Sequence, residues 1–335
     1  MPQLLNEPAR ERSEELDQDW IGRDAFDPRQ LGPDQPGRGY QIGWKESQPL
    51  EIIGELRPAL HADLVHFNDR FSSHPWCLVP SALERLVVGN VPSMLEEWMP
   101  TERYAVWQQT NQHRHTVTAA MTFIARDGLH TAVVPPLPEP GDFLMLATHE
   151  LVETSLNARH EAEGHIWQDQ THTGLSHTLW TEYVVERTRS EIANELGLAP
   201  CTLHQSSMTD QLGDWLAELP SLLDWAVVND AVPTAIFQHW YELGHIFAMA
   251  MGRADGGIAA SRADLDRAVA MEWISSAGEQ WNLLTGSLRR VFEQPALSAN
   301  EHDIAVRRDG WLPLYDASGD EWNRRYEDLV TTTFG

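Results

Sequence analysis

One short β-rich stretch most constrains the fold of this chain, because the hydrophobic patterns around it are helical. The runs TVTAAMTFIA and LHTAVVPPL, residues 116–125 and 129–137, flank Arg126, Asp127 and Gly128. An Asp-Gly pair between two β-rich runs is a strong signal of a tight hairpin turn. The prolines that follow cannot donate hydrogen bonds to a strand ladder. The sequence therefore predicts one β-hairpin, and it indicates no other strand pair convincingly.

Helical patterns lie on both sides of this hairpin. The apolar spacing predicts helices between 50 and 115, with Pro58 and Pro92 kinking or dividing the first two. After the hairpin, Asp142 is expected to cap a helix that runs to about residue 162. Beyond 200 the patterns are helical again. The expected fold class is α+β and predominantly α-helical.

The chain divides into three expected regions. Residues 1–45 are polar, acidic and interrupted by proline and glycine, which predicts an extended or partly disordered leader. Residues 46–200 are expected to hold a helical region and the core built on the hairpin. Residues 201–335 form a helical C-terminal region, which either continues the same domain or makes a second one.

The charge balance excludes some classes of partner. The 335 residues include 24 Lys and Arg against 50 Asp and Glu, a net charge of −26. Such a surface repels phosphate backbones, so we expect no nucleic-acid partner. No apolar stretch approaches the roughly 18–20 residues of a membrane span, and the N-terminus has no apolar signal core. Cys77 and Cys201 give no disulfide framework. We therefore expect a cytoplasmic protein with no membrane partner.

The helix after the hairpin carries the sequence HELVE, residues 149–153. His149 and Glu153 are four residues apart and share one helix face, on a stripe that also includes Leu146 and Leu156. A carboxylate on an apolar stripe needs a partner, because burying a bare charge is costly. A metal ion is one possible partner, and a simple hydrogen bond between His149 and Glu153 is the alternative.

The next helix supplies a second carboxylate. Glu182 lies on the same apolar stripe as Val185 and Ile192, so it is expected to face inward and to act as a further metal ligand. The alternative is a salt bridge from Glu182 to Arg187 or Arg189 at a helix–helix seam. Nucleotide-binding and serine-hydrolase motifs are absent from the sequence.

This order of a hairpin, a His-Glu helix and a Glu helix resembles the zincin metallopeptidases, in particular compact gluzincins of the ImmA/IrrE type. The resemblance covers roughly residues 100–200. It implies a zincin-like core with zinc held by His149 and Glu182, and Glu150 as the general base for a metal-activated water that attacks a peptide bond. The substrate or partner would be a peptide or protein, paired along LHTAVVPP as an edge strand.

The sequence departs from this family at one ligand. The second histidine of the family falls on Glu153. A site with one histidine and two glutamates is harder and more anionic, so Mn or Fe could replace Zn. Two further hypotheses follow: a zincin fold that has lost catalysis and serves as a binding or regulatory module, and a carboxylate-rich Fe or Mn protein built on helices.

Two other histidines are candidate accessory residues. The sequence YELGH, residues 241–245, matches HELGH except at Tyr241. His245 is interpreted either as a satisfied histidine of a buried helix or as the ligand that is missing at 153, supplied from across the fold. His177 lies five residues before Glu182, so it could approach a metal or a tetrahedral oxyanion.

Overall fold

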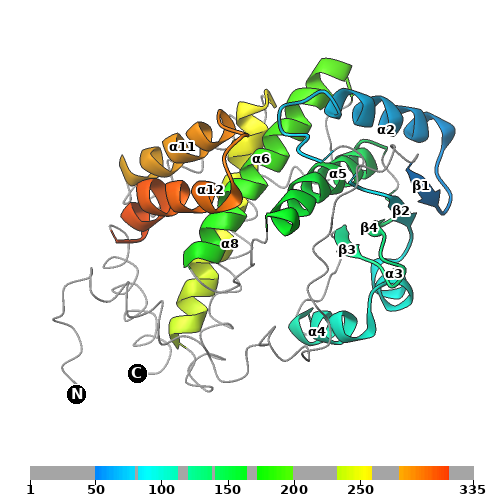
Figure 1. The fold of residues 1–335 in the computed structure, drawn as a ribbon, viewed down its shortest axis with the longest axis horizontal. Coiled ribbons are helices and arrows are strands. Elements are labelled where there is room, and N and C mark those ends of the chain that lie inside the picture. The colour runs from blue at the N-terminus through cyan, green and yellow to red at the C-terminus, as the bar shows by residue number, and fades with distance from the viewer. Residues whose placement is uncertain are drawn as a thin grey trace.

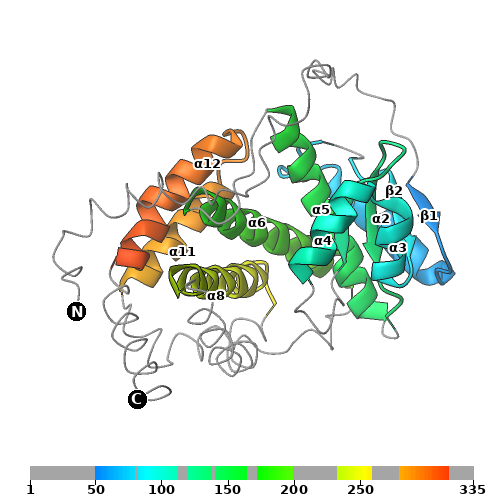
Figure 2. The ribbon, with the colours of Figure 1, turned by 90° about the horizontal axis from the view of Figure 1, so that it is seen from below.

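In the computed structural model of the chain, the described residues form a small sheet at one end of the fold and helices that extend away from it (Figures 1 and 2). The structure describes residues 50–79, 82–111, 120–137, 140–163, 172–198, 232–258 and 279–316. The expected leader, 1–45, lies outside these ranges. Within them the fold is α+β and predominantly helical, which confirms the predicted class.

Within the described residues, the sheet has four strands in the order β1-β2-β4-β3. The strands are β1 (Glu51–Ile53), β2 (Arg85–Val88), β3 (Met121–Ile124) and β4 (His130–Val134). β1 and β4 both pair in parallel with β2, whereas β3 pairs antiparallel with β4. The predicted hairpin is therefore confirmed. Its turn uses Gly128 at φ 85°, a left-handed conformation that favours glycine.

Two sequence predictions about this region are wrong. β1 and β2 fall in segments that were predicted to be helical; they are only three and four residues long, and each pairs with a strand distant in sequence. The run LHTAVVPP was predicted to be the edge strand, but β4 is bonded on both sides, and β3 ends the sheet on that side. The local sequence pattern of β4 could not predict that β2 would pair with it in parallel.

Pro58 and Pro92 divide the two predicted helical segments and do not kink a helix, because each lies in the first turn of a helix that follows a strand. Pro58 is the first residue of α2 (Pro58–Phe71), and Pro92 is the second residue of α3 (Val91–Trp98). Proline suits a first turn, because its missing N–H would have no intrahelical acceptor there. α4 (Thr101–Asn111) follows α3.

Both faces of the sheet are covered. Side chains alternate along a strand, so Leu86 and Ala132 point into the main core with α2 and α5, whereas Val87 and Val133 point into a smaller cluster with α3. Figure 2 shows α3 and α4 on the same side of the sheet. The sheet therefore forms the middle layer of a small α/β/α arrangement, which holds β3 and α5 side by side.

The remaining helices extend the core away from the sheet. These are α5 (Pro140–Ala162), α6 (His172–Leu196), α8 (Val232–Asp255), α11 (Glu279–Phe292) and α12 (Ala299–Val306), with a π-helical turn at Arg307–Trp311. α6 packs against α5, α8 and α12 (Figure 1). α5 starts two residues before Asp142, so Asp142 lies in its first turn and is not its N-cap.

The buried side chains of both halves of the chain belong to one continuous cluster. It runs from Leu60 in α2 through α5 and α6 to Leu314 near the end of the described chain. The division into regions at residue 200 remains a prediction. Among the described helices, none is long and apolar enough to cross a membrane.

Candidate metal centre

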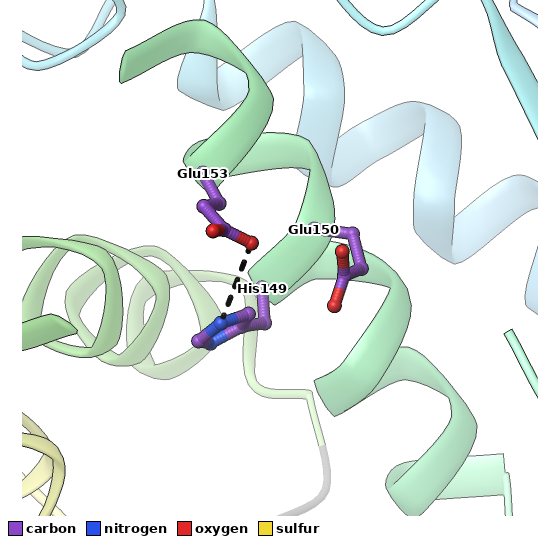
Figure 3. Close-up of side chains that lie close together, drawn as sticks. All are labelled: His149, Glu150 and Glu153. Atoms are coloured by element: carbon purple, nitrogen blue, oxygen red, sulfur yellow. Dashed lines mark ion pairs between the residues drawn. The ribbon is translucent and has the colours of Figure 1, made fainter. Parts of the chain in front are cut away.

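α5 places His149 and Glu153 on one side, one turn apart (Figure 3). His149 Nε2 lies 4.0 Å from Glu153 Oε2, and the two side chains are 15% and 26% exposed. This separation is too long for a hydrogen bond, so the simple His149–Glu153 hydrogen bond is not formed. Both groups are half-buried at the helix surface that faces α6.

α6 and α8 bring two more groups to the same place. Glu182 Oε2 lies 3.8 Å from His149 Nε2, and Glu182 Oε1 lies 3.4 Å from His245 Nε2 on α8. The alternative arginine partners of Glu182 are engaged elsewhere: Arg187 binds Glu191, and Arg189 binds Glu186. The carboxylate of Glu182 therefore lies between imidazoles from two different helices.

One oxygen of this carboxylate lacks a donor. Among the residues that the structure describes, Glu182 Oε2 is buried and has no hydrogen-bond partner. Burial raises the pKa of Glu182, but His245 and His149 outweigh burial and lower it below its ordinary value. Glu182 is thus held as an anion, and a buried anionic oxygen without a donor is stabilised by a cation.

A second carboxylate on α6 orients His149. Glu186 Oε1 lies 3.0 Å from His149 Nδ1, and Glu186 Oε2 accepts hydrogen bonds from Arg189 and Arg253. Burial opposes ionisation of Glu186, but the two arginines keep its pKa well below the ordinary value. An ionised Glu186 can accept the Nδ1 proton of His149, and a metal ion that replaced the Nε2 proton would then meet the Nε2 lone pair on the side of Glu153 and Glu182. This is the usual outer support of a metal-binding histidine.

Sequence reasoning missed Glu186. Its local signal is weak, because the sequence shows only the i,i+3 pair with Arg189. Its other partners, His149 and Arg253, are 37 and 67 residues away.

The concentration of carboxylates shifts the proton affinity of the site. Burial alone would lower the pKa of His149, but the hydrogen bond to Glu186 and the charges of Glu182 and Glu186 raise it to about 10. Burial, reinforced by the charge of Glu182, raises the pKa of Glu153 despite the opposing effect of His149. The groups therefore attract positive charge, whether a proton or a metal ion.

Glu150 projects from a different side of α5 (Figure 3). It is buried, and its Oε2 accepts a short hydrogen bond from the Thr122 hydroxyl on β3. Burial and the charge of Glu153 raise the pKa of Glu150 to about 8. Donor atoms of His149, Glu150 and Glu153 lie within 4.8 Å of one another. Glu150 is thus close to the cluster while its carboxylate is held by the sheet.

The donor set suits a transition-metal ion. Zinc binds imidazole nitrogen and carboxylate oxygen at about 2.0–2.2 Å, so neighbouring ligand atoms in a tetrahedral site are about 3.3 Å apart. The three nitrogen–oxygen separations here are 3.4, 3.8 and 4.0 Å. Small side-chain rotations would close the longer two. With donor atoms of His149, Glu150 and Glu153 within 4.8 Å of one another, the cluster on α5 could hold an ion, and Glu182 on α6 lies 3.8 Å from His149 Nε2.

The structure places His177 in a different buried group. Its Nδ1 lies 2.9 Å from Asp303 Oδ1 on α12, and its ring packs edge-on against those of His160 and Trp180. Trp180 Nε1 donates to the same Asp303 oxygen. His177 therefore helps to join α12 to α6, and it is not brought to the His149 cluster.

Comparisons with known proteins found no match to this chain. No protein-family model matches it, and neither a curated protein nor a solved structure is similar to it. The function is therefore inferred from the residues of the site.

Proposed function

We propose that this chain is a metal-dependent hydrolase of peptide bonds, in which His149, Glu153 and Glu182 hold a zinc ion or, given the oxygen-rich donor set, manganese or iron. The observation that carries the proposal is the Glu182 carboxylate. It has one buried oxygen without a hydrogen-bond donor, and it faces the imidazoles of two other helices. Glu186 supports the ion indirectly by fixing the orientation of His149.

Glu150 is the proposed general base. A metal ion held here would supply a Lewis acid for the peptide carbonyl and would lower the pKa of a water to about 7. Glu150 lies next to the cluster, and Thr122 holds one of its carboxylate oxygens. A cation bound nearby would favour ionisation of Glu150, whose other oxygen could then accept a proton from the attacking water. The Thr122 hydroxyl keeps one carboxylate oxygen fixed and leaves the other for the water.

The edge of the sheet is the proposed peptide-binding element. β3 ends the described sheet beyond β4, and Thr122 connects this strand directly to Glu150. A peptide that adds to an exposed strand edge is held by main-chain hydrogen bonds. A substrate paired along β3 would therefore pass beside the general base. This assignment moves the expected edge from β4 to β3.

The base assignment is tested by replacing Glu150 with glutamine. We expect Glu150→Gln to reduce hydrolysis of a mixed peptide library at least about 100-fold, because general-base catalysis contributes 10²–10⁴-fold. Metal content should remain that of the wild type. Glu97→Gln, at an exposed position on α3, is the matched control. Peptide cleavage is followed by mass spectrometry and metal content by elemental analysis. Hydrolysis that survives in Glu150→Gln would overturn the assignment.

The donor arrangement also favours a second function, a carboxylate-rich iron or manganese protein. The two carboxylates and two imidazoles come from three helices, which is typical of helical metal carboxylate proteins. Iron bound stoichiometrically, above all two ions per chain, together with no peptide cleavage would favour this function. Protein that stays metal-free, with unchanged stability after chelation, would instead favour a binding module without catalysis.

A further inference from the structure

We infer that His245 on α8 is a fourth metal-binding residue, which supplies the second imidazole that the HELVE sequence of α5 lacks. This inference builds on the proposed function, because it assumes that His149, Glu153 and Glu182 bind a metal. It adds a ligand from a helix far along the chain, and it changes the expected coordination of the ion.

The position of His245 is that of a ligand. Its Nε2 lies 3.4 Å from Glu182 Oε1, the shortest of the three separations in the cluster, and its side chain is 29% exposed. His149 and His245 therefore approach one carboxylate from α5 and α8, and an ion between these helices would be within reach of both rings.

The packing of α8 fixes this position. Gly252 lies seven residues after His245, two turns along the same helix face. A Cβ atom at Gly252 would meet the Tyr183 carbonyl oxygen on α6 at 2.6 Å, so α8 approaches α6 closely there. The next residue, Arg253, donates to Glu186, the carboxylate that orients His149. The position of His245 along the axis of α8 relative to Glu182 is thus set by contacts two turns further along that helix.

Four protein ligands restrict the metals that can support catalysis. A tetrahedral ion held by His149, Glu153, Glu182 and His245 would have no position left for water, as in structural zinc sites. An octahedral ion such as Mn²⁺ or Fe²⁺ would keep two positions. We therefore expect zinc to bind more tightly and Mn²⁺ or Fe²⁺ to give the faster hydrolysis.

Replacing His245 with asparagine tests the inference. Changing an indirect partner of a metal ligand typically weakens binding 10–100-fold, so loss of a direct ligand should weaken zinc binding by at least about 100-fold. Affinity is measured by chelator competition on the full chain, and the visible absorption of bound Co²⁺ should change at the same time. His66→Asn, at an exposed position on α2, is the control and should match the wild type. Equal affinity and an equal Co²⁺ spectrum in His245→Asn would overturn the inference.

X-ray absorption spectroscopy of the zinc-loaded wild type counts the imidazole ligands of the ion. This test does not depend on whether a variant folds. Two imidazoles bound to zinc are expected, and a single imidazole would overturn the role of His245 while leaving the proposed function intact. A wild-type chain that takes up neither zinc, cobalt nor manganese would overturn both. The two failures are therefore distinguishable.

Discussion

Glu153 is the residue at which the sequence HELVE departs from the HExxH pattern of zinc hydrolases. A carboxylate at this position keeps the i,i+4 geometry with His149 but adds negative charge to the cluster. That charge contributes to the raised pKa of Glu150. It also means that a bound cation would stabilise the cluster more strongly. Glu153 also accepts a long hydrogen bond from Asn157 one turn further along α5. The alternative to a role as metal ligand is therefore a structural role in this contact.

Replacing Glu153 with histidine separates these two roles. If Glu153 is a ligand, Glu153→His restores a histidine at i,i+4 and should bind zinc at least as tightly as the wild type, whereas Glu153→Gln should bind it more weakly. Chelator competition measures both affinities. A Glu153→His chain that loses its fold or binds zinc less well than Glu153→Gln would show that Glu153 serves the contact with Asn157.

The period of the α-helix made it possible to predict how three residues of the site are placed. His149 and Glu153 share a face because they are four residues apart, and Glu182 faces inward because it continues an apolar stripe. The sequence could not rank His245 above a satisfied core histidine, because its approach to Glu182 depends on how α8 packs on α6. Contacts across 63 residues leave no local pattern.

At the scale of elements, the site depends on the close packing of α8 against α6. Gly252 allows this approach, since any side chain there would meet the α6 backbone at Tyr183 and Arg187. The short parallel strands show what could not be predicted from the sequence at this scale. The hairpin of β3 and β4 was predictable because Asp127-Gly128 is a local turn signal, whereas β1 and β2 pair only through non-local contacts.

A Gly252→Ala substitution tests the packing of α8. The added Cβ would lie 2.6 Å from the Tyr183 carbonyl oxygen, so we expect a loss of about 1–3 kcal/mol in the free energy of unfolding. Zinc affinity should fall as well, because His245 moves with the helix. Gly286→Ala on α11 is the control: its Cβ would meet only Arg290 Nη1, at 3.9 Å, and Ala there should stabilise the helix by about 0.5–1 kcal/mol. A Gly252→Ala chain as stable as wild type would contradict this packing.

At the scale of the whole molecule, a buried histidine joins the C-terminal helices to the core. His302 on α12 is 1% exposed, lies against the rings of Trp76 and Trp180, and makes a hydrogen bond through Nε2 to the Gln294 carbonyl oxygen. Burial, aided by the charge of Arg159, lowers the pKa of His302 below its ordinary value of 6.5. The folded chain therefore holds His302 in its neutral form.

This burial predicts a pH dependence of stability. A histidine with a lowered pKa in the folded state contributes stability above its unfolded pKa, and that contribution is lost as the pH falls through the folded value. Between about pH 7 and about pH 5, the unfolding free energy of the wild type should fall more steeply than that of His302→Gln. Denaturant titrations at each pH give both slopes. His66→Gln on the exposed face of α2 should keep the wild-type slope, and parallel slopes for His302→Gln would refute the role of this burial.

The central claim is that His149, Glu153 and Glu182 hold a metal ion, and elemental analysis combined with chelation tests it most directly. Protein purified without added metal, stripped with chelator and then dialysed against zinc should take up about one ion per chain and gain thermal stability, because the ion binds the folded state. Glu182→Gln should take up far less. A stripped wild-type chain that binds no metal and melts at the same temperature with and without zinc would contradict the account.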